Sequence, residues 1–94
     1  MSNQGTIIAV FEVPGMTAGQ YDRIIEDLEA AGLGEPEGRL FHVAGPRGDG
    51  WIVVDVWASA QQFERFGQTL MPIVQQLGLT PTPQVYPVYN LIEG

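Results

Sequence analysis

The sequence contains neither cysteine nor lysine, and it has a single histidine, His42. A chain without cysteine has no disulfide, thiolate zinc site, iron–sulfur cluster or cysteine nucleophile. Eleven acidic residues stand against four arginines, which gives a formal net charge of −7. Such a charge repels the phosphates of nucleic acid and of anionic lipid, so we expect neither as a partner.

Long apolar runs are also missing, and none approaches the ~20 residues that a membrane helix needs. The first residues, 1–5, lack a basic region followed by an apolar stretch, so we expect no signal peptide and a cytoplasmic location. One histidine and scattered acids form no cluster at metal-ligand spacing. The glycine-rich turn at 45–50 joins two strands and opens no helix, unlike a phosphate-binding loop. We therefore expect no metal and no cofactor.

Glycine and proline residues, which interrupt regular secondary structure, divide the chain into six predicted helices and strands. We predict strands at 6–13, 39–44, 51–57 and 84–92, and helices that begin at Thr17 and Ser59 and end near Gly32 and Gly78. Thr17 and Ser59 are each followed three residues later by glutamine, the capping-box spacing. Pro72 predicts a kink or a restart of the second helix. Pro87 marks the last strand as an edge or exchanged strand.

This order predicts a single α+β domain over residues 1–94 with a ferredoxin-like βαββαβ fold. Two helices would cover one face of a four-stranded antiparallel sheet and leave the other face bare. We assign Ile52, Val54, Val56, Phe41 and Val43 to the helix side, and Trp51, Val53, Asp55, Trp57, Leu40, His42 and Ala44 to the bare side. A bare face with two tryptophans is too apolar for water and predicts an interface or a binding groove.

Three segments resemble a known group of proteins: Val54 to Phe63 (VDVWASAQQF), Leu40 to Pro46 (LFHVAGP) and Pro87 to Ile92 (PVYNLI). Together they resemble the dimeric α/β-barrel superfamily. More narrowly, they are similar to small bacterial proteins that are like antibiotic biosynthesis monooxygenases. A histidine often stands in those proteins where this chain has Tyr89.

The resemblance implies a homodimer in which two sheets pack face to face. It also implies a pocket in each protomer, between sheet and helices or toward the barrel interior, with Trp57 as one wall. The superfamily includes cofactor-independent monooxygenases of polyphenols, polyketide cyclases, lactone isomerases and haem-degrading enzymes. Haem-degrading members carry a histidine on the helix after the tryptophan, and this helix has none, which argues against haem degradation.

His42 is the candidate general base, because imidazole is the side chain that ordinarily changes charge near neutral pH. A general base needs an orienting partner, and Asp55 lies opposite or diagonal to His42 on the predicted hairpin, with Cβ atoms roughly 5–8 Å apart. A mid-strand carboxylate among apolar residues also needs compensation. Two structural alternatives stay open. In the first, His42 is a hydrogen-bonded residue of the sheet with no catalytic role. In the second, Asp55 forms a salt bridge to Arg39 or Arg47 across a dimer interface.

Aromatic side chains form a second candidate feature. We predict that Trp57, Tyr89, Trp51 and Tyr86 bind a flat apolar or aromatic ligand. A dimer interface, which also favours tryptophan and tyrosine, is the alternative, and for Trp51 it is the simpler one. Phe63 and Phe66 are predicted to pack between helix and sheet.

Two functions follow from these features. The first is a cofactor-independent small enzyme, a monooxygenase, cyclase or isomerase, in which His42 and Asp55 remove a proton from an aromatic or polyketide-like substrate. The second is a non-catalytic dimer that binds a small apolar ligand or serves a structural role.

Overall fold

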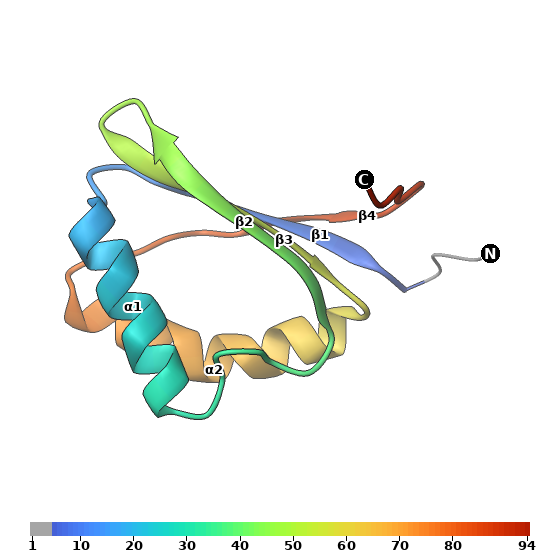
Figure 1. Cartoon of the computed structure of the whole chain (residues 1–94), viewed down its shortest axis with the longest axis horizontal. Coiled ribbons are helices and arrows are strands. Elements are labelled where there is room, and N and C mark those ends of the chain that lie inside the picture. Colours follow the sequence, from blue (N-terminus) through green and yellow to red (C-terminus); the bar gives the residue numbers. More distant parts are fainter. Residues whose placement is uncertain (1–4) are drawn as a thin grey trace.

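The elements of the computed structural model, which describes residues 5–94, follow the predicted order (Figure 1). They are β1 (Ile7–Val13), α1 (Ala18–Ala30), β2 (Arg39–Arg47), β3 (Gly50–Trp57), α2 (Ala60–Gln76) and β4 (Gln84–Pro87). Residues 1–4, on which the expectation about a signal peptide partly rests, lie outside the described residues. The predicted ferredoxin-like α+β fold is confirmed.

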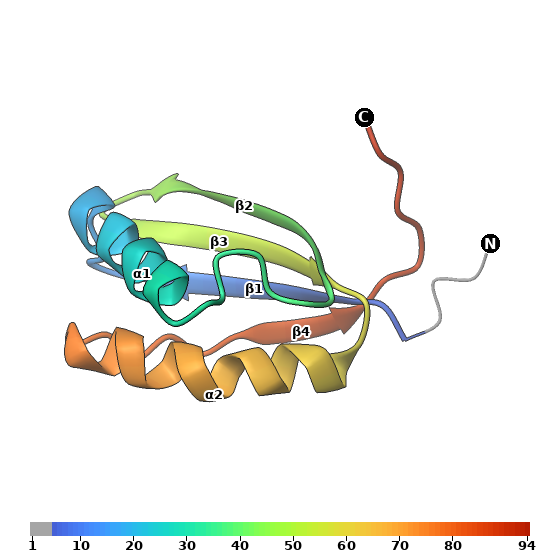
Figure 2. The ribbon, with the colours of Figure 1, turned by 60° about the horizontal axis from the view of Figure 1, so that its bottom comes forward.

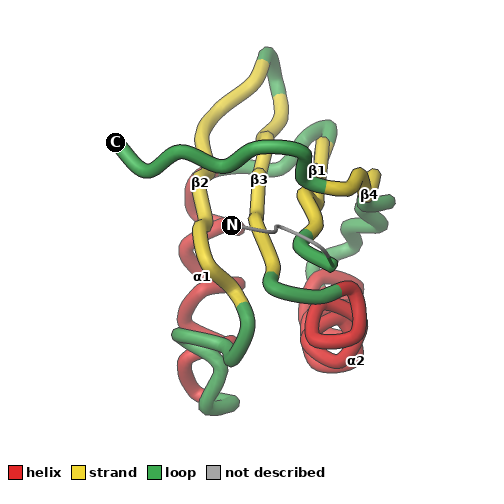
Figure 3. Tube along the Cα trace, turned by 90° about the vertical axis from the view of Figure 1, so that its right-hand side faces the viewer, coloured by secondary structure: helices red, strands yellow, loops and turns green. Residues whose placement is uncertain are grey.

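The four strands form one sheet in the order β2-β3-β1-β4, and every neighbouring pair is antiparallel. Both helices lie on the same face of this sheet, with α1 beneath β2 and α2 beneath β1 and β4 (Figure 3). Among residues 5–94, no helix covers the opposite face. Within the described part of the chain, neither helix is long and apolar enough to span a bilayer.

Both helices begin at the predicted capping residues. Thr17 accepts a hydrogen bond from the backbone N–H of Gln20, and the Gln20 side chain accepts one from the backbone N–H of Thr17, which completes a capping box. Ser59 accepts a hydrogen bond from the backbone N–H of Gln62 at the start of α2. Pro72 lies inside α2, and the helix continues through it to Gln76, so the predicted restart does not occur.

The two faces of the sheet are exchanged relative to the prediction. The helices cover Trp51, Val53, Asp55 and Trp57 of β3 and His42 and Ala44 of β2, all of which we had assigned to the bare face. The side chains predicted for the core, Ile52, Val54, Val56, Phe41 and Val43, lie on the other face. Leu40 is the extra residue of a β-bulge in β2 and is 49% exposed.

This exchange has a physical reason. Both faces of β3 are apolar, so its alternation does not decide which one is buried. The neighbouring strand β1 decides it, because its buried side chains are Ile7, Ala9, Phe11 and Val13, which pair with the odd-numbered residues of β3. Trp57 is fully buried and packs on Phe63 and Phe66 of α2, with ring centroids 5.7 and 5.0 Å away. The predicted place of Phe63 and Phe66 in the core is confirmed.

The face without helices is nevertheless apolar, and we name it the open face. Its apolar side chains come from all four strands: Ile8, Val10, Phe41, Val43, Ile52, Val54, Val56 and Tyr86. Phe41 is 38% exposed and Val43 64%. Its acidic residue, Glu12, pairs with Arg47 at 3.1 Å. A contiguous apolar surface of this kind is therefore present, although its side chains are not the predicted ones.

The last strand is shorter than predicted. It spans Gln84–Pro87 instead of 84–92, and its pairing with β1 ends at Pro87. Beyond it the chain extends away from the helices (Figure 2). Tyr89 is 99% exposed and Ile92 76%. One hydrogen bond continues beyond Pro87, from the backbone N–H of Val88 to the carbonyl oxygen of Thr6 at 3.0 Å, so the missing N–H of the proline does not itself end the contact with β1. The proline is tolerated because β4 forms the edge of the sheet, as predicted.

Candidate functional site

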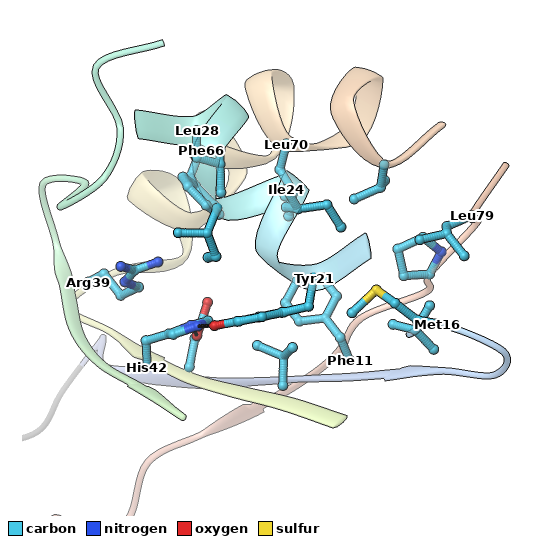
Figure 4. Close-up of a pocket in the computed structure, with 16 residues that line it drawn as sticks. Phe11, Met16, Tyr21, Ile24, Leu28, Arg39, His42, Phe66, Leu70 and Leu79 are labelled. Carbon is cyan, nitrogen blue, oxygen red and sulfur yellow. Dashed lines mark hydrogen bonds and ion pairs between the residues drawn. The ribbon is translucent and has the colours of Figure 1, made fainter. Parts of the chain in front are cut away.

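A cavity of about 60 Å³ lies between the sheet and the two helices (Figure 4). Its polar or ionisable lining residues are Tyr21, Arg39, His42 and Asp55. The rest of the lining is apolar and consists of Phe11, Val13, Met16, Ile24, Ile25, Leu28, Val53, Phe66, Leu70, Val74, Leu79 and Pro81. One water needs about 10–15 Å³ of such space, so the cavity has room for a few waters and is smaller than an engineered cavity of ~150 Å³ that binds benzene. An apolar pocket with a few convergent polar groups is the usual form of a small-molecule site.

His42 and Asp55 form a direct hydrogen bond at this cavity. They are paired across β2 and β3, and His42 Nδ1 lies 2.6 Å from Asp55 Oδ1. The second carboxylate oxygen, Oδ2, accepts a hydrogen bond from Nε1 of Trp57 at 3.3 Å. Asp55 is only 2% exposed, so these two donors supply the compensation that a buried carboxylate needs. The alternative of a salt bridge from Asp55 to Arg39 or Arg47 is not what the protomer contains.

Tyr21 extends this chain of hydrogen bonds on the other side of the imidazole. Its hydroxyl oxygen lies 2.6 Å from His42 Nε2, and the two rings are nearly parallel, with centroids 6.1 Å apart. Burial raises the pKa of the Tyr21 phenol above its ordinary value of 10.0. The positive charge of Arg39 opposes that rise, whereas the negative charges of Asp55 and Asp22 add to it. Tyr21 is therefore protonated at neutral pH and has a proton to donate.

These partners define the proton positions on a neutral His42 ring. A carboxylate only accepts, so the ring nitrogen that faces Asp55, Nδ1, carries the proton. The other nitrogen, Nε2, is then an acceptor and receives the hydrogen bond of the Tyr21 hydroxyl. The result is a directed chain in which Tyr21 donates to His42 and His42 donates to Asp55.

Arg39 reaches the same cavity through an irregularity of β2. The pairing with β3 shifts between Arg39 and Phe41, so Leu40 is an extra residue. Residues three apart in a regular strand point to opposite faces, but this bulge places both Arg39 and His42 on the helix side. Gly38 precedes the bulge with φ at +93°, and a Cβ there would come within 2.4 Å of the Gln62 side chain. A glycine is therefore needed where the loop enters β2.

The predicted aromatic ligand site is not assembled in this protomer. Trp57 does not line the cavity, and its polar contact is with Asp55. Trp51 stacks on Tyr21 with ring centroids 5.7 Å apart, and its buried Nε1 has no partner among the described residues. Tyr86 lies on the open face with its hydroxyl on Gln84, and Tyr89 is exposed beyond β4. Of the two pocket positions that the resemblance implies, the protomer contains a cavity between sheet and helices, and Trp57 is not among its lining residues.

Sequence reasoning missed Tyr21 and Arg39. Tyr21 recurs at helical spacing with Ile24 and Leu28, which favours a packing role, and its phenol hydroxyl is the signal that distinguishes it from these apolar neighbours. Arg39 was considered only as an ion-pair partner. The bulge that turns it toward His42 leaves no recognisable pattern in the sequence. Across residues 5–94 there is no group of three histidines or acids able to hold a metal ion.

Comparison with known proteins supports the fold. No protein-family model and no curated sequence matches the chain significantly. A structure of an antibiotic-biosynthesis-monooxygenase-like protein from Caulobacter crescentus shares 15% identity over 92% of both chains, with a TM-score of 0.70. SnoaB from Streptomyces nogalater, a cofactor-independent oxygenase, shares 19% identity over 95% of this chain and 96% of its own, with a TM-score of 0.60.

A monooxygenase-like protein from Shewanella loihica shares 20% identity over 93% of this chain and 97% of its own, with a TM-score of 0.59. Identities this low establish a common fold and leave function open. The resemblance to antibiotic-biosynthesis-monooxygenase-like proteins is thus confirmed at the level of the fold.

The raised pKa of Tyr21 predicts a specific alkaline instability. Between pH 10.0 and the higher pKa of the folded state, the unfolded chain releases the phenol proton and the folded chain keeps it. The free energy of unfolding therefore falls as the pH rises through this window. In urea unfolding at about pH 9 and about pH 11, wild type should lose more stability than Tyr21→Phe. Tyr86→Phe is the matched control and should behave like wild type. Equal losses in wild type and Tyr21→Phe would contradict the buried position of the phenol.

Proposed function

We propose that the chain is a cofactor-independent enzyme that removes a proton from a small aromatic or polyketide-like molecule. The observation that carries the proposal is the Tyr21–His42–Asp55 chain in the wall of an otherwise apolar cavity. Acid–base catalysis commonly uses three groups in a row: one that exchanges a proton with the substrate, a base that is hydrogen-bonded to it, and a third group that orients the base. The cofactor-independent oxygenase SnoaB, which has the same fold, supports the assignment.

Tyr21 changes the mechanism that sequence alone suggested. His42 Nε2 is already occupied by the Tyr21 hydroxyl, so the substrate proton reaches His42 through the Tyr21 oxygen. As the O–H or activated C–H bond of the substrate breaks, its proton bonds to the Tyr21 oxygen. The former Tyr21 proton moves at the same time to Nε2. The products of this step are a substrate anion and an imidazolium ion, and the carboxylate of Asp55 stabilises the imidazolium.

The anion has three fates that begin with this same step. In a cyclase or an isomerase it forms a new bond or is reprotonated at another atom. In a monooxygenase dioxygen is the co-reactant, and the carbanion is oxidised as it supplies electrons to the oxygen. The apolar lining favours the shared first step of all three reactions. It excludes water, and this strengthens the electrostatic attraction between the imidazolium that the step forms and the Asp55 carboxylate.

A small-molecule-binding protein without turnover is the second candidate. The observation that favours it is that both oxygens of Asp55 and both nitrogens of His42 are already satisfied within the protein. A fully satisfied network stabilises a fold without any chemistry. Turnover therefore has to be measured, together with ligand binding.

Substrate screening gives the test of catalysis. Wild type should convert at least one member of a panel of hydroquinones, other single-ring phenols and their keto tautomers, and the reaction is followed by absorbance and oxygen uptake. His42→Gln should lower kcat/KM by roughly 10²–10⁴-fold, the usual contribution of a general base. Tyr21→Phe should be similarly impaired, because phenylalanine passes on no proton, whereas Tyr86→Phe should retain full activity. Full activity of His42→Gln would rule out this mechanism, and ligand binding without turnover would favour the second candidate.

We further infer that a second copy of the chain covers the open face. Most of its side chains are aliphatic or aromatic, the polar Gln84 accepts a hydrogen bond from the Tyr86 hydroxyl, and its acidic residue Glu12 is paired with Arg47. A surface without free charge suits a partner of the same composition, and a two-fold axis brings identical patches together. The resemblance to dimeric α/β barrels implies the same packing.

Light scattering on a size-exclusion column tests this assembly. Wild type should elute as a dimer at micromolar concentration. Val54→Glu should be monomeric, because Val54 pairs with Val10 and Val43 at the centre of the open face, where a carboxylate would be buried unpaired. Gln68→Glu adds the same charge on the exposed side of α2 and should remain dimeric. A monomeric wild type would show that no second copy covers this face.

A further inference from the structure

The cavity has a polar end and an apolar end. Arg39 and His42 lie at one end, and Met16 and Leu79 lie at the other (Figure 4). A ligand that fills this space is therefore itself polar at one end. Its polar group meets a cation, because the Arg39 guanidinium is permanently charged at neutral pH.

Within the part of the chain that the structure describes, no ion pair neutralises the charge of Arg39. Among residues 5–94 the salt bridges of arginine are those of Arg23 with Asp27 and of Arg47 with Glu12. The guanidinium of Arg39 donates one hydrogen bond to the backbone oxygen of Gly34 at 3.2 Å and lies 6.0 Å from the ring centroid of Phe66. A guanidinium has five N–H donors, so this single hydrogen bond leaves most of the Arg39 donors available to a ligand.

The acidic side chains near the cavity do not form an ion pair with the Arg39 guanidinium that would exclude an anionic ligand. Asp55 is the buried acid, and its two oxygens are held by His42 and Trp57. Glu35 lines a shallow hollow outside the cavity together with Arg39, but it is exposed and forms no salt bridge with it. Asp22 on α1 is exposed as well. A half-buried guanidinium beside an aromatic ring is thus left with open donors in a chain whose net charge is −7.

We propose that Arg39 binds the anionic oxygen of the ligand, so that the cavity prefers an ionised phenol, enol or carboxylic acid to a neutral ligand of the same shape. This inference rests on the proposed use of the cavity as the ligand site. Arg39 then has a specificity role that is separate from proton removal. When a phenol or enol loses its proton to the Tyr21 oxygen, the anion is produced at the end of the cavity where Arg39 is placed.

The β-bulge explains why this residue is available. Without the extra residue Leu40, Arg39 and His42 would point to opposite faces, and the guanidinium would lie on the open face. Bulges that turn a side chain toward a site are common beside active sites. The cationic donor and the proton-transfer chain thus come from one short segment of β2.

Equilibrium binding of 4-nitrophenol and 4-nitroaniline tests the inference without any turnover. Both are single-ring ligands of nearly the same shape, and 4-nitrophenol is yellow when ionised, so absorbance reports which form is bound. Wild type should bind the phenolate more tightly than 4-nitroaniline. Arg39→Gln should weaken phenolate binding by about tenfold, the lower end for a hydrogen bond to a charged group. It should leave 4-nitroaniline binding unchanged.

Further variants separate charge from shape and from catalysis. Arg39→Lys should recover part of the phenolate affinity, and Arg65→Gln, which removes an exposed arginine of α2, should bind like wild type. His42→Gln should keep the preference for phenolate, because that preference does not need the base. The inference would be overturned if Arg39→Gln lowered the affinity for both ligands equally. It would also be overturned if wild type bound neither ligand. If the preference for phenolate persists while no substrate is turned over, the catalytic proposal fails and this inference stands.

Discussion

The carboxylate of Asp55 is buried at the centre of the sheet, and much of the architecture around it serves to compensate that burial. It is 2% exposed and accepts hydrogen bonds from His42 and Trp57. Leaving a buried charge without such partners costs several kcal/mol, which is a large part of the stability of a small domain. The need to hold these two donors therefore constrains the register of β2 against β3 and the helix-side position of Trp57.

The same constraint links folding to chemistry. Once Asp55 orients His42, the free nitrogen of the imidazole points toward α1, and Tyr21 of that helix completes the chain at 2.6 Å. The helix α1 and the β2–β3 hairpin thus meet at one wall of the cavity. The bulge at Leu40 adds Arg39 to this wall, so that an imidazole and a guanidinium line the same largely apolar cavity. The proposed function uses both groups, His42 to receive the substrate proton through Tyr21 and Arg39 to bind the resulting anion.

The sequence was sufficient for the element order, the capping residues and the pairing of His42 with Asp55, because turns, caps and hairpin neighbours are local features. It was not sufficient for the orientation of the sheet. Both faces of β3 carry apolar side chains, and the choice between them is made outside this strand. It follows from the pairing with the buried side chains of β1 and from the packing of Trp57 on Phe63 and Phe66. The bulge at Leu40 is likewise invisible in the alternation of β2, so Arg39 could not be placed. The four predicted aromatic residues are separated in the protomer for the related reason that Trp51 and Trp57 lie on the helix side, whereas Tyr86 lies on the open face and Tyr89 beyond β4.

The proton positions on His42 test the central claim most directly. With one histidine in the chain, the two ring nitrogens of uniformly ¹⁵N-labelled protein give one pair of signals. At a pH where the ring is neutral, the account predicts a proton on Nδ1 that exchanges slowly with water, an unprotonated Nε2, and a change at Nε2 in Tyr21→Phe but not in Tyr86→Phe. A neutral ring that carries its proton on Nε2 would contradict the account, because Tyr21 would then accept that hydrogen bond and could not pass a proton to His42.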